Sequence, residues 1–329
     1  MNPGPGFREK KHSLSVRSLW GSRQESLRVR SPAKVNLRLE VIGRRPDGYH
    51  NIQSVMVPIG LWDVLRIARA GEDEIRVSCT KADIPIDERN LAYRAALLIV
   101  RAAEARDGFH IHIEKNIPVG SGLGGGSSNA ATTLMGVNSL LGNRFSLREL
   151  MGMAAVLGAD VPFFILGQPA LATGTGEKLE EFPLPKLWFV LVYPGISVST
   201  RWAYENLNLW LTNPRVHNNM PPFPQEFNKL EGFFQNDLEK PTMREYPVLE
   251  WIKKRLRSAG AVVSLMSGSG STVYGVFFSK NRAAEAYSHL KGEFGGGDWE
   301  VFLAHSIGRG IQKGGQQHGN HRCKGFPCE

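Results

Sequence analysis

The stretch "PVGSGLGGGSSNAATTL", residues 118–134, combines a glycine-rich loop with the start of a helix. Five glycines fall within residues 120–126, and an alanine-rich run typical of a helix follows. Backbone N–H groups in such a loop point into open space because almost no side chains obstruct them, and the helix N-terminus adds a partial positive charge. The stretch therefore predicts a phosphate-binding loop, in which Ser127 and Ser128 either cap the helix or contact phosphate or a metal ion.

Two common kinds of phosphate loop do not fit this stretch. A Walker A loop places Lys followed by Ser or Thr after its last glycine, whereas residues 127–129 read SSN. The spacing of Gly120, Gly122 and Gly125 satisfies G-x-G-x-x-G, but a dinucleotide-binding unit also needs an acidic residue that closes a second parallel strand about twenty residues later. Residues 144–150 instead open another helix. The loop therefore belongs to a different class of nucleotide-binding protein.

The composition is that of an ordinary globular protein. The chain has 329 residues, of which 42% are apolar and 22% charged, so it forms two domains or one large domain. No apolar run approaches the eighteen or so residues of a membrane span, and we expect no membrane partner. The three cysteines, Cys79, Cys323 and Cys328, do not form a disulfide framework, which favours a reducing, cytoplasmic location.

The net charge of +9 is concentrated at the two ends of the chain. Residues 1–30 hold seven Lys or Arg and two Glu, and residues 301–329 hold four Lys or Arg and one Glu. The remainder is nearly neutral, which argues against a nucleic-acid partner. We expect two disordered extensions, residues 1–26 and 307–329. The first also resembles an organellar transit peptide in its Arg and Ser content, so a bacterial cytosol and a plastid stroma both remain open.

The hydrophobic patterns predict an α+β chain with two domains. Strands are predicted over residues 31–43, 109–117, 169–177, 187–195, 261–266, 272–278 and 299–306, and helices over 89–108, 130–141, 146–157, 248–259 and 281–290. No element is predicted over residues 53–88. The order of elements after residue 187 is typical of a split βαβ (ferredoxin-like) layer. The predicted boundaries are 27–167 for the N-terminal domain and 168–306 for the C-terminal domain.

Three separated motifs together resemble one superfamily. "PAKVNL" (residues 32–37), the glycine loop and "LMSGSGSTVYGVF" (residues 265–277) occur in the order seen in galactokinase, homoserine kinase, mevalonate kinase and phosphomevalonate kinase, the GHMP kinases. With "DGYH" (47–50), "GADVPFF" (158–164), "ATGTGE" (172–177) and "NDLE" (236–239), the chain resembles the family of 4-diphosphocytidyl-2-C-methyl-D-erythritol kinases. This resemblance implies an ATP-dependent kinase of isoprenoid precursor synthesis, with its active site between an N-terminal α/β lobe and a C-terminal lobe.

The resemblance also implies roles for individual residues. Lys34 and Asp160 fall on the family's catalytic lysine and aspartate, so Asp160 is the candidate base and Lys34 its cationic neighbour. The candidate ATP-binding residues are Pro118, Val119, Gly120, Ser121, Gly122, Leu123, Gly124, Gly125, Gly126, Ser127, Ser128, Asn90 and Lys115. Asn90 serves equally well as a helix cap, and Lys115 as a solvated lysine.

The second substrate is expected to be a cytidine diphosphate linked to a polyol. In the family, aromatic and histidine positions after "DG" belong to the cytidine pocket, where a ring stacks on the base. The candidate substrate-binding residues are Asn36, Tyr49, His50, Thr200, Tyr204, Gly268, Ser269 and Gly270. A tyrosine in a turn and a polar strand residue are also ordinary structural features, so the resemblance carries these assignments.

Mg²⁺ is implied because ATP reacts as its metal complex. The sequence shows no cage of carboxylates, and we therefore name no metal ligands. A monomer or a weak dimer is expected. Two other classes remain as alternatives: a sister GHMP kinase that acts on another small alcohol, which should lack the "DGYH" pocket, and a non-enzymatic RNA-binding protein, which would need its basic charge in the folded part.

Overall fold

The computed structural model describes residues 25–71, 74–207, 220–225 and 230–308. Almost all of the two predicted extensions lies outside these ranges. None of the described helices is both long enough and apolar enough to cross a membrane.

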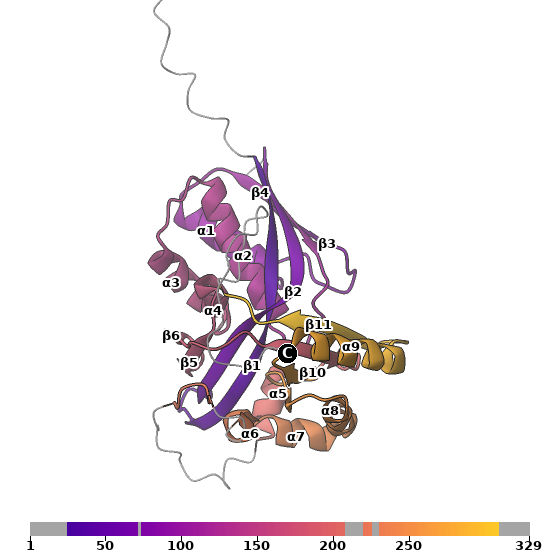
Figure 1. Ribbon diagram of the computed structural model, residues 1–329. Coiled ribbons are helices and arrows are strands. Elements are labelled where there is room, and N and C mark those ends of the chain that lie inside the picture. The colour runs from indigo at the N-terminus through magenta and orange to yellow at the C-terminus, as the bar shows by residue number, and fades with distance from the viewer. Residues whose placement is uncertain (1–24, 72–73, 208–219, 226–229, 309–329) are drawn as a thin grey trace, which may run out of the picture.

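The first sheet is organised around one very long antiparallel hairpin. Within the described residues it has seven strands: β1 (Ser26–Arg44), β2 (His50–Ala70), β3 (Ile75–Cys79), β4 (Gly108–Glu114), β5 (Ala170–Gly174), β6 (Lys178–Glu181) and β8 (Gln235–Asn236). The order β3-β4-β2-β1-β8 forms the main path, and β5 pairs with the lower half of β2. Figure 1 shows β1 and β2 running through both parts of the molecule.

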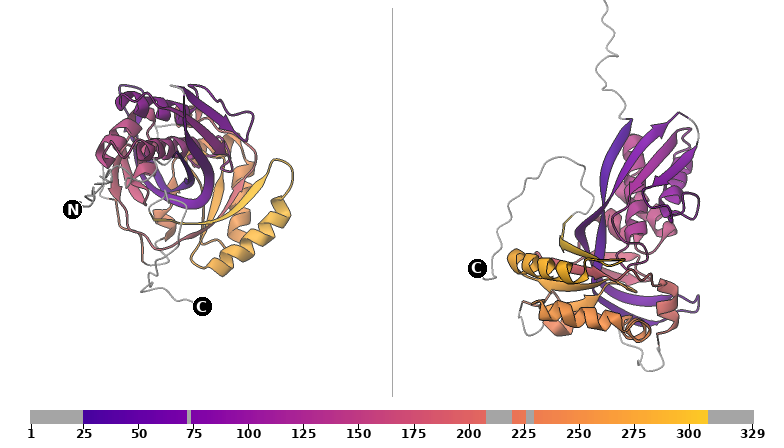
Figure 2. Two further views of the ribbon diagram at one scale, coloured as in Figure 1. Left: turned by 90° about the horizontal axis from the view of Figure 1, so that it is seen from above. Right: turned by 90° about the vertical axis from the view of Figure 1, so that its right-hand side faces the viewer.

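Four helices cover one face of the upper half of this sheet. They are α1 (Leu91–Ala102), α2 (Gly125–Leu140), α3 (Leu147–Leu157) and α4 (Val161–Leu166). The right-hand view of Figure 2 shows these helices on one side of the strands. Their buried residues, such as Ala95, Ala131 and Leu134, meet Leu65 and Ile67 of β2 in one apolar core. The small alanines let α1 and α2 approach closely, which places the start of α2 beside β1.

The second sheet has the predicted split βαβ arrangement. Its strands are β7 (Trp188–Tyr193), β9 (Val263–Met266), β10 (Val273–Phe277) and β11 (Glu300–His305), in the antiparallel order β11-β7-β10-β9. The helices of this part are α5 (Thr200–Glu205), α6 (Leu230–Phe233), α7 (Glu239–Glu245), α8 (Val248–Ser258) and α9 (Lys280–Phe294). The predicted α+β class and the ferredoxin-like second layer are confirmed.

Both faces of the second sheet are buried, and this joins the two parts. Phe189 and Tyr274 face a core that they share with Val35 and Val57 of the long hairpin. Val190 and Val273 face the opposite core, beneath α8 and α9. Because β5 and β8 also pair with the hairpin, strands from the second half of the chain complete the first sheet. The two predicted domains thus share one sheet, and the boundary between them at residue 167 remains a prediction.

The sequence patterns did not predict β2, which is the longest of the described strands. Residues 52–59 of β2 are all buried, because the second sheet covers one side and neighbouring strands and helices cover the other. A strand buried on both faces does not alternate between apolar and polar residues. Pro58 and Gly60 interrupt the run further, close to the register shift at Pro32/Ala33.

Candidate active site

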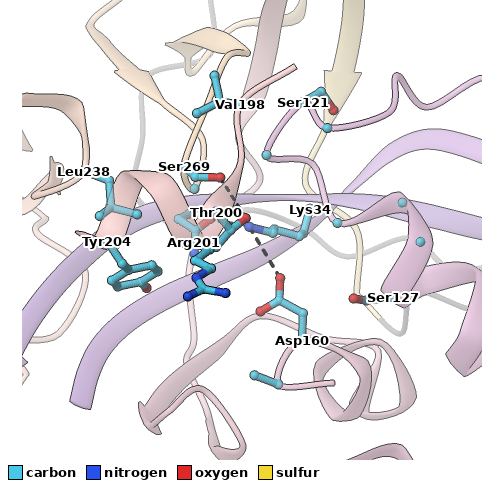
Figure 3. Close-up of a pocket in the computed structure, with 18 of the residues that line it drawn as sticks. Lys34, Ser121, Ser127, Asp160, Val198, Thr200, Arg201, Tyr204, Leu238 and Ser269 are labelled. Carbon is cyan, nitrogen blue, oxygen red and sulfur yellow. Dashed lines mark hydrogen bonds and ion pairs between the residues drawn. The ribbon is translucent and has the colours of Figure 1, made fainter. Parts of the chain in front are cut away.

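A large cavity lies where the long hairpin, the glycine loop and α5 meet. Its volume is about 1600 Å³, which is ample for two substrates side by side. Most of the predicted site residues line it: Lys34, Asn36, Tyr49, His50, Asn90, Lys115, Pro118, Val119, Gly120, Ser121, Gly122, Gly124, Gly125, Gly126, Ser127, Asp160, Thr200, Tyr204, Gly268 and Ser269. Three predicted residues, Leu123, Ser128 and Gly270, do not. Figure 3 shows part of this wall.

Lys34 and Asp160 meet at the centre of the cavity. The ammonium of Lys34, on β1, lies 3.8 Å from Oδ2 of Asp160, which is in the turn before α4 (Figure 3). The Lys34 side chain is almost entirely buried, whereas Asp160 is about one-third exposed to the cavity. Burial lowers the pKa of Lys34 from its ordinary value, and the nearby Asp160 carboxylate opposes that shift. A carboxylate and a cation thus lie side by side.

Asn36 fixes the position of the Lys34 ammonium. Lys34 Nζ donates to Asn36 Oδ1 at 2.6 Å, and Asn36 Nδ2 donates to Ser54 Oγ at 2.8 Å. The Ser54 hydroxyl donates in turn to the Arg38 carbonyl at 2.7 Å. Tyr274, from the second sheet, donates its hydroxyl to the Asn36 carbonyl at 2.7 Å. Since every polar atom of Asn36's amide has a role, its orientation is determined and the ammonium is held in place.

The glycine loop needs glycine for two different reasons. At Gly122 φ is +79°, and a Cβ atom would lie only 2.0 Å from the Ser267 carbonyl oxygen. At Gly126, in the first turn of α2, an added Cβ would meet nothing nearer than Leu91 at 3.9 Å. Gly122 is therefore required by packing, whereas the bare surface of Gly126 faces the cavity at the helix N-terminus, as a phosphate cradle requires.

Hydrogen bonds join the two glycine turns to each other. The Thr272 amide donates to the Ser121 carbonyl at 3.1 Å, and the Ser267 hydroxyl donates to the Gly122 carbonyl at 3.0 Å. Asn236, from the "NDLE" motif, donates to the carbonyls of Gly268 and Met266 at 2.7 and 2.9 Å. The sequence motif is thus explained as a support that holds the second turn against the first.

Asp63 is a buried residue that the sequence patterns did not indicate. Its carboxylate is fully buried and accepts from Lys115 Nζ at 2.5 Å, from Asn129 Nδ2 at 2.9 Å, and from the backbone amides of Asn116 and Ile117 at 2.8 Å. These bonds fix the chain that enters the glycine loop. Lys115 therefore lines the cavity as one half of a buried ion pair and is not a freely solvated lysine.

Two other predicted residues have local structural roles. Asn90 caps α1: its side chain accepts from the Ala92 amide at 2.9 Å and donates to the Pro85 carbonyl at 2.7 Å. It nevertheless lines the cavity. The Ser128 hydroxyl is buried 2.7 Å from the Ser31 hydroxyl, so of the two serines only Ser127 reaches the cavity.

The other end of the cavity is aromatic. The His50 and Tyr204 rings stack with their centroids 5.1 Å apart, and Tyr49 lies beside them with 67% of its surface exposed. Burial lowers the pKa of His50, and the positive charge of Arg44 lowers it further. The Thr200 hydroxyl lies 3.1 Å from that of Ser269 (Figure 3). Flat rings and a neutral histidine suit a planar heterocycle such as a nucleobase.

Comparison with known sequences gives consistent matches. The family of GHMP kinase N-terminal domains matches residues 90–168, and the GHMP kinase C-terminal family matches residues 222–296. A 4-diphosphocytidyl-2-C-methyl-D-erythritol kinase from Syntrophotalea carbinolica is 44% identical over 84% of this chain and 98% of its own length. The enzyme of that name from Geobacter sp. is 45% identical over 81% of this chain and 95% of its own length.

Solved structures agree at the level of the fold. A crystal structure of a 4-(cytidine 5'-diphospho)-2C-methyl-D-erythritol kinase superposes with a TM-score of 0.70 at 35% identity, over 86% of this chain and all of the other. A homoserine kinase from Cytophaga hutchinsonii gives a TM-score of 0.69 at 19% identity, over 89% of this chain and 98% of its own, which establishes a shared fold only.

Proposed function

Because this chain belongs to the GHMP kinases, and among them to the family of 4-diphosphocytidyl-2-C-methyl-D-erythritol kinases, we propose that it phosphorylates that substrate with ATP. The acceptor is the 2-hydroxyl of the methylerythritol unit. The observation that carries the proposal is the Lys34–Asp160 pair, which lies between the glycine loop and the aromatic end of one cavity.

The proposed reaction is a single in-line transfer. The Asp160 carboxylate accepts the proton of the substrate hydroxyl. As the proton leaves, the hydroxyl oxygen attacks the γ-phosphorus of ATP, and ADP departs. The Lys34 ammonium offsets the negative charge on the transferring group, and Asn36 keeps that ammonium in position. The loop amides near Gly126 and the N-terminus of α2 bind the ATP phosphates. Asn90 and Lys115 are proposed to lie near the adenine.

Mg²⁺ enters with ATP in this proposal. The described residues contain no cluster of three or more His, Cys, Asp or Glu that would hold a metal by themselves. Mg²⁺ needs only one or two protein oxygens when phosphates and water supply the others, and the Ser127 hydroxyl and Asp160 both line the cavity. These residues fit such an ion, whose chemical contribution is to offset phosphate charge.

An ADP-release assay on the full chain with Mg-ATP tests the function. We expect turnover with 4-diphosphocytidyl-2-C-methyl-D-erythritol and background rates with homoserine, mevalonate and galactose. Asp160→Asn serves as the inactive control. Turnover of one of the other alcohols in preference to the cytidine compound would replace this proposal by the sister-kinase alternative.

A cytoplasmic location and a monomeric or weakly dimeric state are further proposals. Analytical ultracentrifugation across micromolar concentrations tests the second, and fractionation of the source cells tests the first. A tight dimer or a plastid location would contradict them.

A further inference from the structure

The two ends of the cavity are connected by one short helix. Thr200 opens α5 near the second glycine turn, and Tyr204 lies one turn further along, beside His50. The negative charges of Asp160 and Asp237 contribute to raising the pKa of Tyr204, after burial, which is the largest cause. A ligand whose base rests on the aromatic end and whose hydroxyl reaches Asp160 must therefore pass along α5.

Arg201 lies on this path. It lines the cavity three residues before Tyr204, and Figure 3 shows its guanidinium between the Tyr204 ring and the Asp160 carboxylate. The side chain is 86% exposed and pairs with Glu205 at 2.8 Å, one helical turn away. An exposed helical ion pair of this kind contributes little free energy, so phosphate oxygens compete with Glu205 at low cost.

We propose that Arg201 binds the diphosphate that links the cytidine to the methylerythritol unit. This inference rests on the proposed function. A guanidinium matches phosphate oxygens with two parallel N–H donors, and the weak, exposed pair that Arg201 Nε makes with Glu205 leaves it able to turn toward phosphate. The diphosphate is the part of the substrate that connects the base to the reacting alcohol, so its charge falls where Arg201 lies.

ATP is a less suitable ligand for this arginine. The glycine loop and Ser127 lie on the opposite side of Lys34 and Asp160 from Arg201 in Figure 3. The donor phosphates are assigned to that side, where loop amides and the α2 N-terminus already neutralise them. Arg201 should therefore affect the acceptor substrate and leave the nucleotide donor unchanged.

The test compares Arg201→Gln with the unmodified full-length protein. We expect KM for the cytidine substrate to rise about 5- to 30-fold at low salt, with kcat and KM for ATP nearly unchanged. In calorimetry, CDP binding should weaken by a similar factor while cytidine binding stays the same. Arg201→Lys should recover part of the loss, because it restores the charge without the planar fork.

A matched control is available on α8. Lys254 is an exposed helical cation that pairs with Glu250 at 3.1 Å and lies outside the cavity, so Lys254→Gln should change none of these values. An unchanged KM and unchanged CDP binding in Arg201→Gln would overturn the inference while leaving the kinase function intact. A raised KM for ATP alone would also overturn it, by assigning Arg201 to the donor. Absence of turnover in the unmodified protein would instead count against the proposed function.

Discussion

The two ends of the cavity differ in how firmly their side chains are held. At the transfer end, Lys34 and Asn36 are only 4% and 3% exposed, and hydrogen bonds fix both. At the aromatic end, Tyr49 is 67% exposed and Arg201 rests on a single surface ion pair. Catalytic groups must be positioned before the reaction, whereas recognition groups can adjust to the ligand. Substitutions at the transfer end should therefore lower kcat, and those at the aromatic end should raise KM.

The largest effect is expected at Asp160. Asp160→Asn removes the proton acceptor but keeps the shape, so kcat should fall about 10²- to 10⁴-fold with KM for ATP little changed. Lys34→Met should lower kcat by at least about 10²-fold, because no cation then offsets the developing charge. Steady-state kinetics with both substrates measures this. Near-normal turnover by Asp160→Asn would remove Asp160 from the role of base.

The next largest effect is expected at Gly122, where the glycine loop packs against the second glycine turn. In Gly122→Ala the new methyl would collide with the Ser267 carbonyl at a φ of +79°, and we expect a loss of about 2–4 kcal/mol in the free energy of unfolding. Gly126→Ala is the control, because its methyl meets open space: it should keep the melting temperature yet raise KM for ATP. Equal melting temperatures for the two variants would show that the two glycine turns can move apart to make room for the methyl group.

These contrasts show which parts of the site a sequence can reveal. The glycine loop, Lys34 and Asp160 lie in short motifs, so the resemblance of those motifs to the family is enough to propose roles for them. The roles of Asp63 and Asn236 depend on partners far away in the chain, such as Asn129, which is 66 residues from Asp63. No local pattern distinguishes a buried acceptor of four hydrogen bonds from an ordinary strand aspartate.

The prediction of the fold from the sequence is limited in the same way, by contacts between distant parts of the chain. Amphipathic helices, and strands with one polar face such as the predicted strand at 31–43, have a clear period in the sequence. In that strand the polar residues Lys34 and Asn36 are buried and line the cavity, so the predicted exposure of this face to solvent is wrong. The strand β2 was not found because both of its faces are covered, and the covering comes from strands and helices that follow it in the chain. The sequence likewise gives no signal for Arg201, since only the fold brings it between Tyr204 and Asp160 (Figure 3), the position on which its proposed role depends.

A moderate effect is expected at the aromatic end. Tyr204→Ala removes a ring that stacks with His50, and base stacking contributes about 1–3 kcal/mol, so KM for the cytidine substrate should rise about five- to hundredfold. Tyr204→Phe keeps the ring and should remain close to the unmodified protein. Tyr49→Ala should act in the same direction. If Tyr204→Phe lost as much affinity as Tyr204→Ala, the hydroxyl and not the ring would be the binding group.

The smallest effect is a shift in pH dependence. Burial lowers the pKa of His50 below its usual 6.5, and the charge of Arg44 lowers it further. Between the lowered pKa and 6.5 the unfolded chain binds more protons than the folded chain, so this contribution to stability rises with pH and is lost as pH falls through that window. Neutral His50 is also the form suited to contact an uncharged base, so affinity for the cytidine substrate should decline on acidification.

Arg44→Gln tests the cause of this shift. With the arginine charge removed, burial alone acts, and the pKa of His50 should rise toward 6.5 yet remain below it. An NMR titration of the His50 ring measures this directly, and the acid decline in affinity for the cytidine substrate should move to higher pH by the same amount. Arg45→Gln is the control, because Arg45 pairs with Asp47 and does not line the cavity. An unchanged His50 titration in Arg44→Gln would mean that burial alone sets the pKa, and the acid limb of binding should then be identical in the two proteins.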